Sequence, residues 1–161
     1  MSLRRGPIRR KGDGFIVDLG DDESAIIRRL TGELRSLLTD PEPNPEARAL
    51  IARLFPIAYP DDEEMEAEYQ RLMREELVAS KLSAFDIIDD AVTANGAIDE
   101  PRLIAVMQSI NSIRLVLGAM LDVSDEFDAT EVAPGFEASP EYALYGYLSW
   151  LLERCVTALM G

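Results

Sequence analysis

The chain has 161 residues, of which 47% are apolar and 29% are charged, and these values are typical of one soluble globular domain. It contains 30 acidic and 16 basic residues, which give a formal net charge of -14, and it has no histidine and a single cysteine. This composition excludes serine–histidine and cysteine–histidine nucleophile pairs, histidine metal ligands, cysteine zinc clusters, C-x-x-C redox pairs and internal disulfides.

Basic residues are concentrated at the start of the chain, where the first eleven positions include Arg4, Arg5, Arg9, Arg10 and Lys11. No apolar stretch follows them, so the segment does not resemble a secretory signal. The rest of the chain is strongly acidic and is expected to repel phosphate backbones and anionic lipid surfaces. We therefore expect no membrane binding, and nucleic-acid binding only through this basic segment.

A small β-hairpin is predicted next to the basic segment. Residues 7–10 and 14–19 flank the turn signal Lys11-Gly12-Asp13-Gly14, and residues 14–19 are rich in β-forming side chains. Residues 1–20 are therefore expected to form a basic N-terminal arm or hairpin.

Helical periodicity begins at Asp21, where apolar residues recur at steps of three and four: Ile26, Ile27, Leu30, Leu34, Leu37 and Leu38. The prolines of residues 40–45 end this helix, and Pro45 begins a short second helix that ends by Pro56. A long third helix is predicted from Asp61 to about Thr93, with an apolar face made of Met65, Tyr69, Leu72, Met73, Leu77, Phe85, Ile88 and Val92.

Asp99 and Pro101 predict the start of a fourth helix, because Asp caps helices and Pro fits the first turn. An acidic loop is expected over residues 122–138, and Ser139-Pro140 predicts the start of a fifth helix. Since isolated helices are marginal in water, the apolar stripes are expected to face one another. The predicted fold is mainly all-α, a five-helix bundle or orthogonal helical array with a small N-terminal β-hairpin, in one domain over residues 1–161 whose helical body covers 21–160.

Four stretches carry a resemblance to a known family: residues 53–62 with Leu-Phe-Pro-Ile-Ala-Tyr, residues 66–72, residues 109–118 with Asn-Ser-Ile-Arg, and the closing helix with Gly146-Tyr147-Leu148. In these stretches the chain resembles the actinobacterial family of unknown function DUF2017. That family is typically encoded beside the ClpS protease adaptor, so the resemblance implies a regulatory or proteolysis-linked role in the cytoplasm. It implies no catalytic residues, and the family pattern has an aspartate where this chain has Ser112.

Asn111 and Arg114 lie three residues apart within an apolar run, so they share one helical face. An unpaired buried charge is costly, and we therefore expect Arg114 to pair with a carboxylate of the third helix, with Glu68 or Asp86 as the leading candidates. Such a pair would fix the helix register, and the alternative is a site for an anion or for a partner's carboxylate.

Two carboxylate pairs on the third helix suggest a weaker alternative, a magnesium site. Glu63 with Glu66 and Asp86 with Asp89 have the spacing with which all-α nucleotide pyrophosphatases hold Mg²⁺. On one straight helix the two pairs would lie roughly 30 Å apart, so they meet only if the helix breaks near residues 80–83. The simpler interpretation is a solvated acidic face without a metal.

Aromatic residues gather near the C-terminus, where Tyr142 and Tyr145 share one predicted helix face and Tyr147 and Trp150 another. Core packing with a rim tyrosine is the simpler interpretation, and a dimer or partner surface that includes Tyr145 and Trp150 is the alternative. Cys155 falls within the apolar stripe of the same helix and is expected to be buried and unreactive.

Together these features predict a non-enzymatic regulatory or adaptor-type protein that acts through protein contacts and uses no cofactor. The expected partner is a protein, either a second copy in a homodimer or a component of the proteolysis or transcription machinery. A lone thiol favours the reducing cytoplasm. Two alternatives remain open: a transcription-associated regulator that uses the basic N-terminal arm, and the magnesium-dependent nucleotide pyrophosphatase.

Overall fold

The computed structural model describes residues 6–94, 96–121 and 140–161, so Arg4, Arg5, the predicted acidic loop and Ser139 lie outside the described residues. In chain order the elements are β1 (Ile8–Lys11), β2 (Gly14–Val17), α1 (Asp21–Thr39), α2 (Pro45–Ala52), α3 (Glu63–Ala94), β3 (Ala97–Ile98), α4 (Glu100–Met120) and α5 (Pro140–Met160). The mainly helical fold with five helices and an N-terminal hairpin is confirmed.

Local sequence signals account for several helix boundaries. The Asn44 side chain accepts a hydrogen bond from the Ala47 amide at 2.7 Å, and the Asp99 side chain accepts one from the Arg102 amide at 3.0 Å. Each caps a helix whose first turn contains a proline, Pro45 in α2 and Pro101 in α4. These side chains satisfy amides that a helix start would otherwise leave without partners.

The hairpin is extended by a strand that the sequence did not predict. β1 and β2 pair in antiparallel register from Ile8–Val17 to Lys11–Gly14, and β3 adds to β2 with Phe15 opposite Ile98. A Cβ on Gly14 would lie 2.8 Å from the Ile98 carbonyl oxygen, so the close approach of β3 requires glycine there. With only two residues, β3 is too short for a sequence pattern to indicate it.

Arg10 of β1 connects the sheet to the C-terminal end of α5. The guanidinium lies 4.9 Å from the centre of the Phe15 ring, and Nη2 donates to the carbonyl oxygens of Ala158 and Leu159 at 3.4 and 3.3 Å. These contacts place a cation at a helix C-terminus, where the carbonyl groups favour positive charge. Phe15 is buried beneath, so the small sheet is an integral part of the body.

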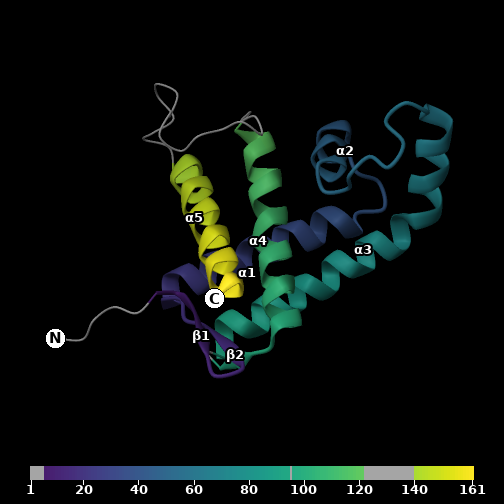
Figure 1. The fold of residues 1–161 in the computed structure, drawn as a ribbon. Coiled ribbons are helices and arrows are strands. Elements are labelled where there is room, and N and C mark those ends of the chain that lie inside the picture. The colour runs from purple at the N-terminus through teal and green to yellow at the C-terminus, as the bar shows by residue number, and fades with distance from the viewer. Residues whose placement is uncertain (1–5, 95, 122–139) are drawn as a thin grey trace.

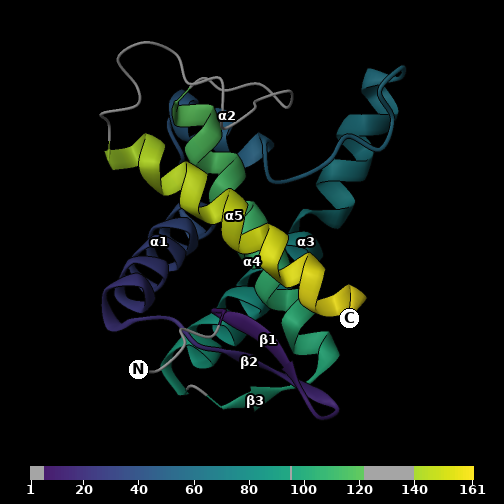
Figure 2. The ribbon, with the colours of Figure 1, turned by 60° about the vertical axis from the view of Figure 1, so that its left-hand side comes forward.

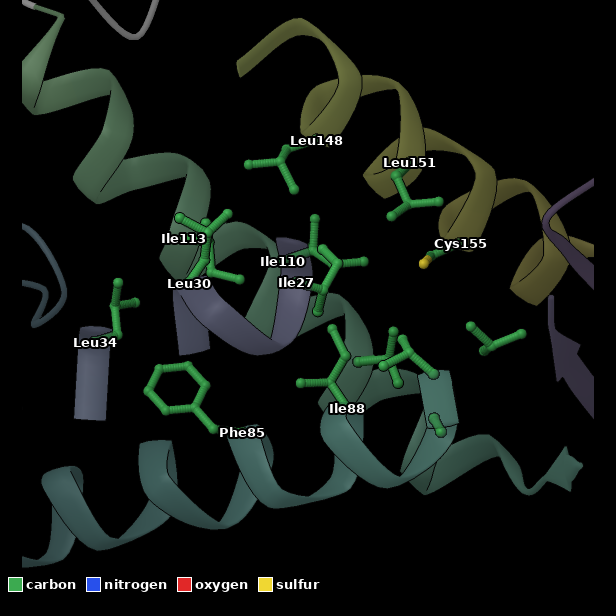
Figure 3. Close-up of a cluster of buried hydrophobic side chains, with 14 of the residues drawn as sticks. Ile27, Leu30, Leu34, Phe85, Ile88, Ile110, Ile113, Leu148, Leu151 and Cys155 are labelled. Atoms are coloured by element: carbon green, nitrogen blue, oxygen red, sulfur yellow. The ribbon is translucent and has the colours of Figure 1, made fainter. Parts of the chain in front are cut away.

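The central element is α4, which lies beside α5 and crosses α3 in both ribbon views (Figures 1 and 2). Figure 3 shows the core that these helices enclose together with α1, formed by Ile27 and Leu30 of α1, Phe85 and Ile88 of α3, Ile110 and Ile113 of α4, and Leu148, Leu151 and Cys155 of α5. The prediction that the apolar stripes face one another is therefore correct for this part of the molecule.

Of the described helices, only α4 is long and apolar enough to cross a membrane, with a mean hydropathy of 1.5 over its best 18-residue window. In the fold, 56% of that window is buried inside the protein. The apolar character of α4 is accounted for by its central position, because it packs against helices on several sides.

The two halves of α3 have different surroundings. Among residues 63–83, all of them described, none is buried, and the first buried residue of the helix is Ala84. The expectation that the whole apolar face of this helix packs against the core is wrong for the first half, where Met65 is 48% and Leu72 is 62% exposed. In both ribbon views this end of α3 stands clear of α4 and α5 (Figures 1 and 2).

Candidate functional site

The connection between α2 and α3 is held against the exposed half of α3 by one carboxylate. Glu66 Oε1 accepts hydrogen bonds from the backbone amides of Ala58 and Tyr59, both at 2.8 Å. Leu54 and Phe55, which begin the connection, are buried in the body. The Leu-Phe-Pro-Ile-Ala-Tyr stretch is therefore anchored at one end by burial and at the other by Glu66.

Side chains spaced four residues apart continue from this carboxylate along α3. Gln70 Nε2 donates to Glu66 Oε2 at 2.8 Å, and Arg74 donates to Gln70 Oε1 at 2.9 Å. The Arg74 guanidinium lies 4.3 Å from the centre of the Phe55 ring. The hydrogen bonds from Gln70, Tyr59 and Ala58 lower the pKa of Glu66, so this residue stays ionised and in place at neutral pH.

An apolar hollow of about 240 Å³ opens beside this anchored connection. The first half of α3, which projects from the rest of the molecule (Figures 1 and 2), is called the arm from here on, and it is distinct from the basic N-terminal segment. We call the apolar residues that line the hollow the arm patch: Tyr59, Met65, Tyr69, Leu72 and Met73. The rings of Tyr59 and Tyr69 meet edge to face, with centroids 6.0 Å apart. Because two segments separated in sequence supply these side chains, the patch has a defined shape before any partner arrives.

The helix segment that carries most of the arm patch is acidic. Residues 63–80 contain six glutamates and two arginines. Glu68 lines the hollow and pairs with Arg71 at 2.7 Å on the exposed surface. Glu66 binds the backbone amides of the connection. The patch is thus an apolar surface on an acidic segment of α3, with Glu68 at its edge.

The predicted partner of Arg114 is wrong. Arg114 Nη2 donates to Asn111 Oδ1 at 2.9 Å on its own helix, and its guanidinium lies 6.0 Å from the centre of the Tyr145 ring. Glu68 pairs with Arg71 instead. The arginine that pairs with carboxylates of α3 is Arg35 of α1, which the sequence pattern did not indicate.

Arg35 forms salt bridges with both aspartates of the second carboxylate pair, Asp86 and Asp89. Its Nη2 lies 2.8 Å from Asp86 Oδ1, its Nη1 lies 2.8 Å from Asp89 Oδ2, and Thr31 donates to Asp89 Oδ1 at 2.7 Å. Arg35 thus bridges two carboxylates that lie three residues apart on α3, one to each terminal nitrogen of its guanidinium.

The magnesium alternative lacks the geometry it needs. α3 runs without a break through residues 80–83, so Glu63 and Glu66 stay far from Asp86 and Asp89 along the helix. Within the described part of the chain, no three acidic or cysteine side chains gather as metal ligands. Glu66 accepts hydrogen bonds from backbone amides and both aspartates pair with Arg35, so three of the four residues proposed as ligands have structural partners.

The aromatic residues of α5 lie on two different faces of the helix, as their spacing predicts. Tyr142 and Tyr145 are buried, whereas Trp150 is 45% exposed and lies 6.0 Å, centroid to centroid, from Tyr147. Burial and the nearby Glu23 carboxylate raise the pKa of Tyr147 to about 12. The predicted burial of Cys155 is confirmed.

A second surface hollow lies beside Trp150 and Tyr147, and the start of α1 lines it with Asp21, Asp22 and Glu23. Acidic residues in the first turn of a helix interact favourably with its positive end. This role explains their position without a ligand.

Two arginines of the basic segment form contacts within the protein. Arg9 pairs with Asp18 across the hairpin at 3.5 Å, and Arg10 binds the end of α5. Lys11 is exposed at the hairpin turn.

The fold and these surfaces define a mainly helical domain with a small antiparallel sheet. The family model described as Domain of unknown function (DUF2017) matches residues 5–159, so the chain belongs to this family, in agreement with the resemblance. No curated protein and no solved structure matches the chain.

Proposed function

We propose that this chain is a regulatory or adaptor-type protein of the cytoplasm that works by binding another protein through the arm patch, without catalysis. The observation that supports this role is the exposure of Met65 and Leu72 on a helix half that the body leaves uncovered. Large apolar side chains gathered on a preformed surface are typical of protein interaction sites.

Charge indicates the chemistry of the partner. A segment that docks on the arm patch meets a helix segment rich in glutamates, with Glu68 lining the hollow itself, so it should carry an apolar ridge bordered by lysine or arginine. A second copy of this chain is the less favoured occupant, because each copy carries a net charge of -14 and like charges repel.

The test uses a designed amphipathic helix of leucine and lysine as the probe, and fluorescence anisotropy as the measurement. The variant Met65→Gln/Leu72→Gln removes apolar surface without changing charge. We expect it to bind the probe roughly tenfold more weakly than the wild type, which corresponds to ~1.4 kcal/mol. A leucine–glutamate helix should bind neither protein.

The matched control is Met120→Gln/Met160→Gln, which removes two exposed methionines (64% and 85% exposed) at the ends of α4 and α5. It should bind the leucine–lysine helix as the wild type does. If both double variants bind this probe equally well, the attraction is only electrostatic and the arm patch is not the site.

A further inference from the structure

A small pocket lies on the other side of the connection, at the junction of α3 and α4. Its volume is about 190 Å³. Apolar side chains form one wall, Leu54, Phe55, Pro56 and Leu77, and the polar residues Ser80, Lys81, Gln108 and Ser112 line the rest. The proposed protein-binding role of the arm patch does not involve this pocket.

Among the described residues that line this pocket, Lys81 alone carries a basic group. Nζ donates a hydrogen bond to Ser112 Oγ at 3.2 Å, and no carboxylate among the described residues forms an ion pair with it. Burial lowers the pKa of Lys81, because a half-buried ammonium has lost part of its hydration. A serine hydroxyl is a neutral partner and compensates this loss only in part.

Arg35, unlike Lys81, is paired with carboxylates of α3. One to two turns beyond Lys81, α3 supplies Asp86 and Asp89 to Arg35, each at 2.8 Å. The protein has 30 acidic residues, yet the half-buried Lys81 faces a hydroxyl and open pocket space and no carboxylate among the described residues. The pocket therefore has room for a carboxylate from a ligand.

We propose that this pocket binds the carboxylate of a short, partly apolar acid, with the carboxylate against Lys81 and Ser112 and the apolar part against Leu54, Phe55 and Leu77. A single ammonium matches one negative charge, and the hydroxyl of Ser80 and the amide of Gln108 offer further donors. A phosphate dianion would bring a second charge that no residue lining the pocket offsets. The volume lies below the ~300 Å³ of ordinary ligand sites, so the acid must be small.

Either a free carboxylic acid or the terminal carboxylate of a partner's peptide could provide this group. The chain offers an unusually clean assay, because Lys11 and Lys81 are its only lysines. Reductive methylation with ¹³C-formaldehyde labels both lysines and preserves their charge, and the two lysine signals are assigned with Lys11→Met and Lys81→Met.

We would titrate the labelled protein with butyrate, with a short peptide ending in leucine and a free carboxylate, and with the same peptide amidated. We expect butyrate or the free peptide to shift the Lys81 signal saturably and to raise its measured pKa by roughly one unit, a tenfold preference for the charged lysine. The signal of exposed Lys11 should stay unchanged, and the amidated peptide should have no effect.

Two variants separate a specific site from general ionic effects. Ser112→Ala should weaken binding of the carboxylate, and Lys81→Met should abolish the ligand-induced rise in Tm that Lys11→Met retains. The proposal is overturned if neither carboxylate shifts the Lys81 signal, if Lys11 shifts equally, or if methyl phosphate binds more tightly than butyrate. Because the first titration uses the wild-type sequence, it decides the question even where a variant folds poorly.

Discussion

At the scale of single residues, burial sets the chemistry of the ionisable groups. Cys155 is fully buried among core side chains, and this burial raises the pKa of its thiol to about 12. The sequence predicted the buried position because Cys155 falls on the apolar stripe of its helix. The surroundings of Lys81 were not predictable, because they depend on a connection from another part of the chain folding over α3.

The thiol of Cys155 should be almost inert in the folded protein. At pH 8 a pKa near 12 leaves roughly a thousandfold less thiolate than an ordinary cysteine has, and the thiolate is the reactive form. Labelling with a thiol reagent should therefore be slow in buffer and rapid in urea. Equal rates in both conditions would show that the C-terminal half of α5 does not pack as described.

Replacing Lys81 with methionine should stabilise the fold at neutral pH. The folded state binds the lysine proton less tightly than the unfolded chain, whose pKa is near 10.5, so the charge opposes folding at pH 7. We expect Lys81→Met to raise Tm by roughly 2–4 °C at pH 7. The gain should shrink as the pH rises through the lowered pKa towards 10.5, as thermal denaturation at several pH values would show, while Lys11→Met should have little effect.

At the scale of elements, local signals predicted most boundaries and failed where a tertiary contact decides. The caps at Asn44 and Asp99 and the turn at Gly12, whose φ is 60°, lie where the sequence indicated. The strand β3 and the Arg35 contact with Asp86 and Asp89 were missed, since both join segments more than fifty residues apart. Periodicity also gave no sign that the first half of α3 is exposed, because an interaction surface and a core face share one pattern.

Removing the Glu66 side chain should loosen the connection without unfolding the body. Glu66→Ala deletes the acceptor of the Ala58 and Tyr59 amides, so these two amides should exchange with solvent roughly tenfold faster. Glu68→Ala, which removes an exposed ion-pair partner on the same helix, is the control and should leave both rates unchanged.

Acid should have the same effect on the wild-type connection. Hydrogen bonds from Gln70, Tyr59 and Ala58 hold the pKa of Glu66 below its usual value of 4.5. The stabilisation by this carboxylate is therefore fully present above pH 4.5 and is lost as the pH falls through the lowered pKa. The measurement is the protection factor of the Ala58 amide, its exchange rate relative to the intrinsic rate at the same pH, and a protection factor that stays constant on acidification would contradict this role of Glu66.

At the scale of the whole molecule, the fold combines a body with a projecting arm. In the body, α4 lies between α3 and α5, and side chains from four helices enclose the core (Figure 3). In the arm, the first half of α3 contacts the connection that precedes it through Glu66, which accepts from the Ala58 and Tyr59 amides, and through Arg74, which lies over the Phe55 ring. Composition and periodicity sufficed to predict the body, whereas the arm patch appears only when exposure is known.

This division predicts unequal local stability along one helix. Amides in residues 67–75 should exchange faster than those in residues 84–92, because no residue of the first group is buried and the second group lies in the core. Hydrogen exchange followed by mass spectrometry would measure both. Uniform protection along α3 would mean that the arm is covered, for instance by self-association.

The most direct test of the account is hydrogen exchange of the wild-type protein with and without the leucine–lysine helix. The account predicts that bound probe slows exchange over residues 57–76, which contain the arm patch, and leaves α4 and α5 unchanged. Protection confined to α5 around Trp150, or spread evenly over the acidic surface, would contradict it.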